Sequence, residues 1–232
     1  MPETQSRNAL IAALDPSDQQ LLLRNASLVD LRQGEAFLHP GEPVEYVFFP
    51  ERGLESLVAT TAEGAMVETG VVGIEGGVGI TEALANAPLF PVATTQVAGT
   101  AWKVPARDCR AIYSNEPGRV LIERYAQFML AEARQSVACQ AFHPLDRRLA
   151  RWLWECYVRS GVGSELPLTQ EFMATMLGNR RASVTEALPK LLPCGIRSSR
   201  GKIIIDDPAA LADYACECRG YVDDLRTKLL SF

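Results

Sequence analysis

The sequence has very little histidine, since His39 and His143 are the only two in 232 residues. Metal-dependent enzymes on β-barrels need several histidines with a carboxylate. Neither histidine is typical of a haem ligand, because His39 lies in an expected turn and His143 stands before Pro144. No G-x-S-x-G motif and no Ser-His-Asp spacing is present either. We therefore predict that the protein is not an enzyme and has no metal site or cofactor; a cupin-like barrel enzyme is the weakest alternative.

Paired cysteine motifs are also missing. The sequence has no C-x-x-C motif, so the usual signal of a zinc site is absent. We expect reduced thiols, several of them in the hydrophobic core. Cys216 and Cys218 form a C-x-C pair for which a redox role stays open, although nothing nearby indicates an activated thiolate. The six cysteines are Cys109, Cys139, Cys156, Cys194, Cys216 and Cys218.

Long apolar runs and targeting signals are lacking as well. No segment approaches the roughly 18 apolar residues of a membrane helix, and the polar N-terminus shows no signal peptide. A chain of 232 residues suits one or two domains with real cores. We expect a cytoplasmic protein that does not interact with membranes.

Charge is unevenly distributed along the chain. The net charge is −5, which is unusual for a protein that binds nucleic acid. Residues 1–144 carry 10 basic and 17 acidic residues, whereas residues 145–206 carry 10 basic and 6 acidic residues. A local basic excess of this kind is the electrostatic footprint of a nucleic-acid-binding segment.

The stretch from Leu168 to Leu192 predicts two short helices joined by a tight turn. Thr169 suits the N-cap of the first helix, Gly178 suits a left-handed turn after it, and Asn179 suits the N-cap of the second. A small, polar outer face on the second helix is typical of a DNA-binding helix-turn-helix. The expected inward-facing residues of that helix are Val184, Ala187 and Leu188.

A basic hairpin follows this stretch. Residues 196–206 predict a short strand, a turn at Arg200-Gly201, and a β-branched strand over Lys202–Ile205. A helix-turn-helix followed by such a hairpin is a winged helix, and Arg197, Arg200 and Lys202 near its tip suit contact with phosphates. The plainer alternative is that two packed helices joined by Gly-Asn give much of this pattern without binding DNA.

The N-terminal half predicts two short helices over residues 8–25 and then an antiparallel β-structure. Short runs rich in Val, Phe and Thr alternate with turn signals, which indicates a sandwich or barrel. The expected strands are Ser27–Arg32, Glu35–Leu38, Tyr46–Phe49, Leu54–Thr60, Met66–Val71, Ala93–Val97 and Ala101–Val104.

A glycine-rich loop over residues 73–79 interrupts these strands. It lacks the Lys-Ser/Thr ending of a nucleotide P-loop. Its backbone N–H groups could surround an anion, so Gly73, Glu75, Gly76 and Gly77 are a candidate effector site. We favour the alternative that the loop is a tight corner of the barrel.

Residues 115–141 predict a long helix that Pro144 stops. Apolar residues recur along it at helical spacing, and a helix that long needs a partner beyond its own sheet, so we predict a self-association seam. The alternative is a plain core helix. A second helix over Leu145–Arg159 and a helical tail over Pro208–Leu230 complete the chain. The expected seam residues are Ile122, Tyr125, Ala126, Met129, Ala133 and Val137.

This order of elements resembles that of the Crp/Fnr family of bacterial transcription regulators. The resemblance implies an α+β fold with an antiparallel β-roll (double-stranded jelly roll) over residues 1–114, a dimerisation helix over 115–143, and a winged helix-turn-helix with its tail over 144–232. It rests on Leu168-Thr169-Gln170-Glu171, Leu177-Gly178, Arg181, Val184, Leu188, Ser199-Arg200-Gly201-Lys202, Gly34-Glu35 and Pro40-Gly41-Glu42.

The resemblance implies a homodimeric transcription regulator that binds double-stranded DNA at an inverted repeat and contacts RNA polymerase. Two departures from the family pattern change the DNA-facing side: Ala182 replaces a common Glu, and Glu186 replaces a common Arg. Pro189 should end or kink the second helix early. The expected base-contacting residues are Arg181, Ala182, Thr185 and Glu186, and the expected phosphate-contacting residues are Thr169, Arg180, Ser183, Arg200 and Lys202.

The sequence lacks the residues that bind the known effectors of the family. Cyclic-AMP binders of the family carry an arginine that binds the cyclic phosphate, and Leu89–Thr94 contains none, so we expect no tight binding of cyclic AMP. The oxygen sensors of the family use N-terminal cysteines, and this chain has none before Cys109. The alternative function is a ligand-sensing module without DNA affinity, in which the winged helix binds protein.

Overall fold

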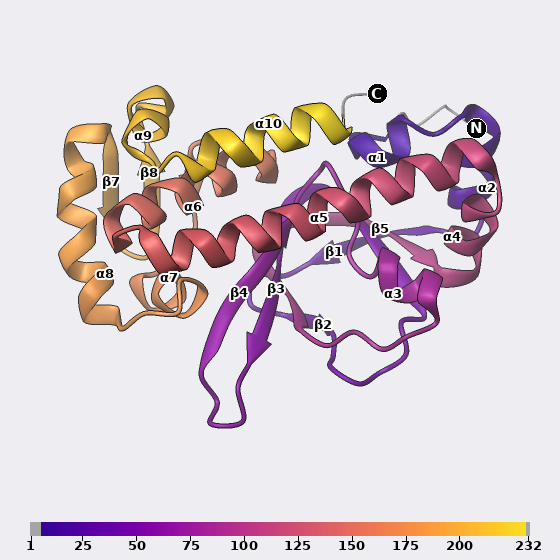
Figure 1. Cartoon of the computed structure of the whole chain (residues 1–232), viewed down its shortest axis with the longest axis horizontal. Helices are drawn as coiled ribbons and strands as arrows, with labels where there is room; N and C mark the ends of the chain where they lie inside the picture. Colours follow the sequence, from indigo (N-terminus) through magenta and orange to yellow (C-terminus); the bar gives the residue numbers. More distant parts are fainter. Residues whose placement is uncertain (1–5, 231–232) are drawn as a thin grey trace.

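The computed structural model describes residues 6–230, and its N-terminal half is an antiparallel β-roll (Figure 1). Two short helices, α1 (Ala9–Ala12) and α2 (Pro16–Leu23), precede the roll as expected. The sheet order is β1-β5-β3-β4, with β2 paired to β5 and every pairing antiparallel. The strands are β1 (Ser27–Leu31), β2 (Ala36–Leu38), β3 (Tyr46–Thr60), β4 (Met66–Val72) and β5 (Val92–Pro105).

The two longest strands each join runs that the sequence analysis separates, so that part of the strand prediction is wrong. Tyr46–Phe49 and Leu54–Thr60 are one strand, β3, because the chain bends through a series of register shifts instead of turning back. Gly53 and Gly99 permit this bend. A Cβ on Gly99 would lie 1.8 Å from the Arg52 carbonyl oxygen, so glycine here allows the two backbones to approach and does not end the strand.

The long helix α5 (Glu116–Phe142) runs along most of the molecule and reaches from the roll to the C-terminal part (Figure 1). It follows α3 (Ile80–Ala85) and α4 (Ala106–Tyr113), which lie at the roll. His143 takes an extended backbone, as residues before proline do, and α5 therefore ends as predicted. The next helix, α6 (Leu145–Ser160), starts at once after Pro144.

The C-terminal part is a winged helix-turn-helix on a small three-stranded sheet of order β6-β8-β7. The final helix, α10, leaves this unit and runs back alongside α5 (Figure 1), where Val222 joins the core of the roll. Its elements are β6 (Glu165–Leu166), α7 (Gln170–Met176), α8 (Arg181–Ala187), the 3₁₀ helix η1 (Leu188–Cys194), β7 (Ile196–Ser199), β8 (Lys202–Ile205), α9 (Pro208–Tyr214) and α10 (Cys218–Leu230).

Two large hydrophobic cores hold these parts together. One fills the roll and is closed by α5. The other belongs to α6 and the helix-turn-helix, and it also includes roll residues Leu54, Val58, Val71 and Val97. The C-terminal unit therefore packs directly on the sheet through buried apolar surface. No helix within residues 6–230 is long and apolar enough to cross a membrane.

Candidate nucleic-acid interface

The helix-turn-helix forms where the sequence predicts it. The Thr169 hydroxyl accepts a hydrogen bond from the Phe172 N–H at 3.1 Å and so caps α7. Gly178 has a φ of +61° and makes the left-handed turn between the helices. Both local predictions are confirmed.

The predicted cap of the second helix is wrong. The N-cap of α8 is Arg180, whose side chain makes no capping bond. The Asn179 side-chain amide instead donates to the Leu177 carbonyl oxygen at 2.7 Å. It therefore satisfies an orphan acceptor at the end of α7.

The buried residues of α8 determine which of its residues face solvent. Val184, Ala187 and Leu188 are buried, as predicted. The α-helix ends at Ala187, and the chain continues as a 3₁₀ helix through Pro189. The predicted early end of this helix is confirmed, because proline has no N–H to donate one turn back.

The four predicted base-contacting residues are exposed together on the outer face of α8. The Arg181 side chain is 69% exposed and its Nε lies 4.0 Å from a Glu171 oxygen. An ion pair that long and exposed is weak, so the guanidinium can turn toward a partner. The Thr185 hydroxyl lies 2.8 Å from Gln170 Oε1, which links the outer faces of α7 and α8.

The wing supplies a second basic region beside the helices. Arg200 and Gly201 both have positive φ, at +47° and +79°, which is the two-residue hairpin turn expected here. A Cβ on Gly201 would lie 3.5 Å from Thr169 Cγ2. The tip of the wing therefore lies against the start of α7.

The candidate phosphate contacts differ in how far their side chains are already engaged. Arg180 and Arg200 are exposed. The ammonium group of Lys202 lies 3.3 Å from a Glu165 oxygen in an exposed pair. Arg197 is held by Asp206 through two hydrogen bonds, so its charge is largely compensated. Ser183 is half-buried, and the hydroxyl of Thr169 already serves as a helix cap.

The glycine-rich loop of the roll is tightly packed, as the corner alternative predicts. A Cβ on Gly76 would lie 2.4 Å from the Tyr125 ring, and one on Gly73 would lie 2.2 Å from the Arg159 carbonyl oxygen. A Cβ on Gly77 would lie 2.8 Å from Ile80. Protein atoms therefore occupy the space next to these residues of the predicted effector site.

Glu75 from this loop belongs to a buried ion network that joins three parts of the chain. The Arg159 guanidinium on α6 pairs with Glu75 at 2.7 Å, with Glu132 on α5, and with the Val71 carbonyl oxygen. Only 1% of the Arg159 side chain is exposed. The network therefore connects the roll, α5 and the C-terminal unit through a single cation.

Further acids, among them the half-buried Glu68, border a small cavity next to this network. Burial raises the pKa of Glu68 to about 7, although Ser56 and Trp152 donate hydrogen bonds to it. The cavity volume is about 30 Å³. Such a cavity can hold a water molecule but not a nucleotide. It is lined by Glu68, Gly70, Val71, Glu132, Ser136, Gln140, Arg151, Trp152, Glu155, Met176 and Leu177.

The residues of α5 that were predicted to form the self-association seam lie on two different faces of the helix. Ile122 and Tyr125 are buried in the core of the roll, and Met129 packs against that core. They are therefore not available to a partner, and this part of the seam prediction is wrong. The physical reason is that the roll needs an apolar cover of its own, which the same helix supplies.

A neighbouring face of α5 carries a different apolar row. Leu130 and Val137 are 45% and 72% exposed. Together with the half-buried Ala126 and Ala133 they follow a spacing of four, three and four residues. This is the spacing of a coiled-coil seam. Three of these four residues were predicted, and Leu130 takes the place of Met129.

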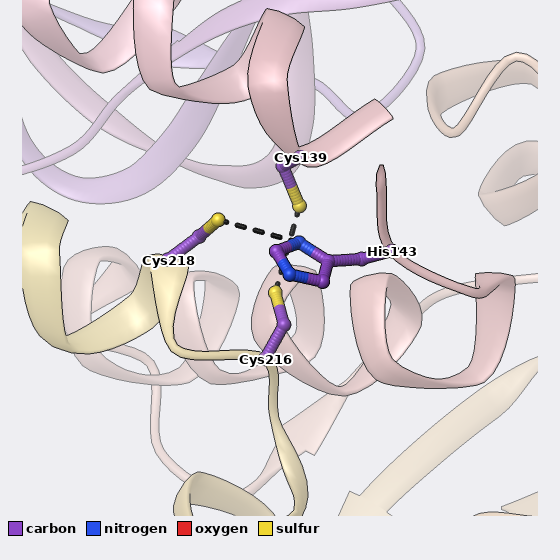
Figure 2. Close-up of side chains that lie close together, drawn as sticks. All are labelled: Cys139, His143, Cys216 and Cys218. Atoms are coloured by element: carbon purple, nitrogen blue, oxygen red, sulfur yellow. Dashed lines mark hydrogen bonds between the residues drawn. The ribbon is translucent and has the colours of Figure 1, made fainter. Parts of the chain in front are cut away.

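The structure also brings together four residues that the sequence analysis did not connect. Cys139, His143, Cys216 and Cys218 lie within 4.8 Å of one another at their ligand atoms (Figure 2). The available signal was a Cys-x₃-His spacing at a helix end together with the C-x-C pair. Neither motif indicates the other, because 77 residues separate Cys139 from Cys216.

Comparison with known proteins agrees with the winged helix-turn-helix fold described above. Residues 147–214 match the family of the Crp-like helix-turn-helix domain. The structure is similar to a CRP/FNR-family transcriptional regulator from Thermus thermophilus, with 25% identity, a TM-score of 0.64, and coverage of 82% of this chain and 98% of that one. No curated protein sequence matches the chain.

Two further solved structures share the fold. A transcriptional regulator of the Crp/Fnr family from Eubacterium rectale is 20% identical, with a TM-score of 0.66 and coverage of 87% of this chain and 94% of that one. FixK2 from Bradyrhizobium japonicum is 19% identical, with a TM-score of 0.66 and coverage of 82% and 98%. The shared architecture extends over both the roll and the winged helix.

Proposed function

Since the chain has the Crp/Fnr regulator fold with a Crp-like helix-turn-helix domain over residues 147–214, we propose that it is a sequence-specific DNA-binding transcription regulator that acts as a homodimer. The observation that carries the proposal is the outer face of α8, where Arg181 is exposed beside a basic wing. In this proposal residues 1–114 are the sensor, residues 115–143 the dimer helix, and residues 144–232 the DNA-binding unit with its tail. A regulator of this kind works on the chromosome in the cytoplasm, with RNA polymerase as its partner.

Each residue on the outer face of α8 has a distinct role in this proposal. The Arg181 guanidinium bonds O6 and N7 of a guanine, which is the commonest specific contact in the major groove. Ala182 contacts a thymine methyl group, Thr185 bonds either kind of base edge, and Glu186 accepts from a cytosine amino group.

The surrounding residues hold the DNA backbone and set the register. Arg180, Ser183, Arg200 and Lys202 contact phosphates, which carry no sequence information. Thr169 contributes through the capped N-terminus of α7 more than through its own hydroxyl, because that hydroxyl already accepts a backbone bond.

Two substitutions separate base contact from phosphate contact. We expect Arg181→Ala to weaken binding to the cognate duplex by about 1–3 kcal/mol and to relax one base position. We expect Arg200→Ala to weaken cognate and scrambled duplexes alike and to flatten the salt dependence. Fluorescence anisotropy at several salt concentrations, on a site selected from random duplexes, measures both effects.

Arg107→Ala, on an exposed side chain of the roll, should leave both affinities unchanged. Equal weakening of cognate and scrambled duplexes by Arg181→Ala would remove the base-contacting role. Failure of the protein to select any duplex at low salt would favour the alternative, a ligand-sensing module whose winged helix binds protein.

The dimer uses the outer row of α5 in this proposal. Two copies of that row, paired about a two-fold axis, would carry two α8 helices into successive major grooves, so the operator is an inverted repeat with half-sites about one helical turn apart. We expect Leu130→Lys to weaken the dimer at least tenfold, about 1.4 kcal/mol, because a lysine from each copy would face the seam. Analytical ultracentrifugation over a dilution series measures this constant.

Leu28→Lys is the matched control for the dimer, because Leu28 is also an exposed leucine but lies on β1. It should leave the dimer constant unchanged. A wild-type protein that stays monomeric at every concentration would refute the dimer. Substitution of Met129 is unsuitable, because its side chain packs on the roll core.

We also propose that the sensor does not respond to cyclic AMP. Three features support this: the absence of arginine in Leu89–Thr94, the packed loop around Gly76, and the neutralisation of Glu75 by Arg159. Isothermal titration calorimetry should show no heat of tight binding with the purified protein. A dissociation constant in the micromolar range or below would contradict the proposal.

A further inference from the structure

Four metal-ligating side chains converge where α5 ends and α10 begins. Cys139 lies in the last turn of α5 and His143 directly follows that helix. Cys216 lies in the link between α9 and α10, and Cys218 is the first residue of α10. Figure 2 shows the three sulfur atoms arranged around the imidazole ring.

The spacing of the ligand atoms fits one small ion. Cys139 Sγ and Cys216 Sγ are 3.5 Å apart, and Cys218 Sγ lies 3.5 Å from His143 Nδ1. Around a tetrahedral zinc ion with bonds of about 2.3 Å to sulfur, neighbouring sulfurs are separated by about 3.8 Å. The cluster therefore already has nearly the dimensions of a coordinated site.

The imidazole is oriented as a metal ligand would be. His143 presents Nδ1 to the cysteines, while Nε2 bonds a Glu217 carboxylate oxygen at 2.9 Å. Metal-binding histidines commonly donate their second ring nitrogen to a carboxylate in this way, which fixes the tautomer. Gln135 Nε2 also donates to Cys218 Sγ at 3.0 Å, a bond suited to a thiolate.

The surroundings also suit a site of negative charge. The three cysteines are buried, at 1%, 5% and 1% exposure. Two cations on α6, Arg148 and Arg151, interact electrostatically with the Cys139 and Cys216 sulfurs. Three thiolates and one imidazole around a divalent ion leave a net charge of −1, which Arg148 offsets, since Arg151 also pairs with Glu155 at 2.8 Å.

We propose that Cys139, His143, Cys216 and Cys218 bind one Zn²⁺ ion in a closed tetrahedral site. Soft sulfur ligands with one imidazole favour zinc, and four protein ligands leave no position for a substrate. Each cysteine binds as a thiolate and releases its proton to solvent, so no oxidation or reduction takes place. The site is structural.

The position of the ion gives it a defined role. His143 immediately precedes the unit formed by residues 144–215, and Cys216 immediately follows it. The ion therefore closes that unit into a loop and attaches both of its ends to α5. Fixing the ends of a long loop stabilises the folded arrangement. That this arrangement orients the winged helix for DNA rests on the proposed function; the metal site itself does not.

Metal content tests the site without DNA. Full-length protein purified without chelators should contain one zinc per chain by inductively coupled plasma mass spectrometry. Cys216→Ser should lose most of the zinc, whereas Cys194→Ser, at a buried cysteine outside the cluster, should keep it. Absence of zinc from the wild type, together with no uptake by the metal-free protein, would overturn the proposal. Iron and inorganic sulfide in the purified protein would overturn it as well. So would a Cys139–Cys216 disulfide that persists when the protein is purified under reducing conditions.

Cobalt substitution tests the geometry in variants that remain folded. Co²⁺ added to the metal-free protein should give thiolate-to-metal charge-transfer bands and the intense visible absorption of a tetrahedral ion. Glu217→Gln should weaken Co²⁺ binding by about 10- to 100-fold, while Asp224→Asn on the exposed side of α10 should not change it. A weak spectrum typical of six oxygen ligands would overturn the site. Zinc binding with no DNA affinity would leave the site intact and refute only the proposed function.

Discussion

Replacement of Arg159 by methionine should lower the free energy of unfolding by about 3–5 kcal/mol, because it leaves uncompensated charge in the interior. The Arg159 guanidinium is almost fully buried and is the shared partner of Glu75 and Glu132. Methionine keeps most of the side-chain volume, so the loss reports the charge and the hydrogen bonds more than a cavity. The roll, α5 and α6 all contribute partners, and the whole molecule should therefore be affected.

Urea unfolding followed by circular dichroism measures this change. Arg107→Met is the matched control, since its side chain is 70% exposed and a surface pair of that kind contributes at most about 1 kcal/mol. Adding Glu132→Gln to Arg159→Met should recover part of the loss, because it removes one of the two stranded carboxylates. A loss below about 1 kcal/mol for Arg159→Met, the size of a surface pair, would show that the network does not hold the parts together.

The second large effect is a dependence of stability on pH that comes from Glu55 in β3. Its side chain is fully buried, and neither carboxyl oxygen has a hydrogen-bond partner within the part of the chain that is described. Burial raises the pKa of Glu55 to about 8. The carboxyl group is therefore protonated in the folded protein at neutral pH, while in the unfolded chain it ionises near its ordinary pKa of 4.5.

The sign of the effect follows from proton linkage. Between pH 4.5 and about 8 the folded state binds a proton that the unfolded state has lost, so stability falls as the pH rises through this window. Glu55→Gln should leave stability nearly unchanged at about pH 4.5 and raise it at about pH 8 by a few kcal/mol, at about 1.4 kcal/mol for each pKa unit. Glu68 should add a smaller dependence of the same sign, since burial also raises its pKa.

Urea unfolding at a series of pH values from about 5 to 9 tests the Glu55 prediction, because this range covers the window in which the two states bind different numbers of protons. Glu42→Gln on an exposed loop is the control and should keep the wild-type slope. If the slope of stability against pH in Glu55→Gln equals that of the wild type, Glu55 is not protonated in the folded state. A variant that is less stable at every pH would likewise contradict the burial of a neutral carboxyl group.

Local sequence signals determined the order and type of the elements. Thr169, Gly178 and Pro189 act on the residues next to them, and the turn at Arg200-Gly201 needs only its own backbone, so each could be predicted without the fold. The periodic apolar residues of α5 and α8 likewise determined that these segments are helices. These effects operate within a few residues, which is why the winged helix could be predicted in detail.

Tertiary packing decided which face each element presents. The rows of α5 that contain Ile122 and Leu130 are both apolar, and only the position of the roll shows that the first is internal and the second exposed. The same limit applies to Gly53 and Gly99, where glycine permits a close approach between strands instead of a turn. Periodicity identifies an apolar face but not its partner.

Only the complete fold brought distant polar residues together. Arg159 meets Glu75 across 84 residues of sequence, and Cys139 meets Cys216 across 77. The return of α10 along α5 places Cys216 and Cys218 beside Cys139, and nothing in the local sequence of either segment indicates that contact. The sequence by itself determined which side chains could bind metal or charge, and the packing of the helices decided which of them meet, because a ligand set is defined by distance in space and not along the chain.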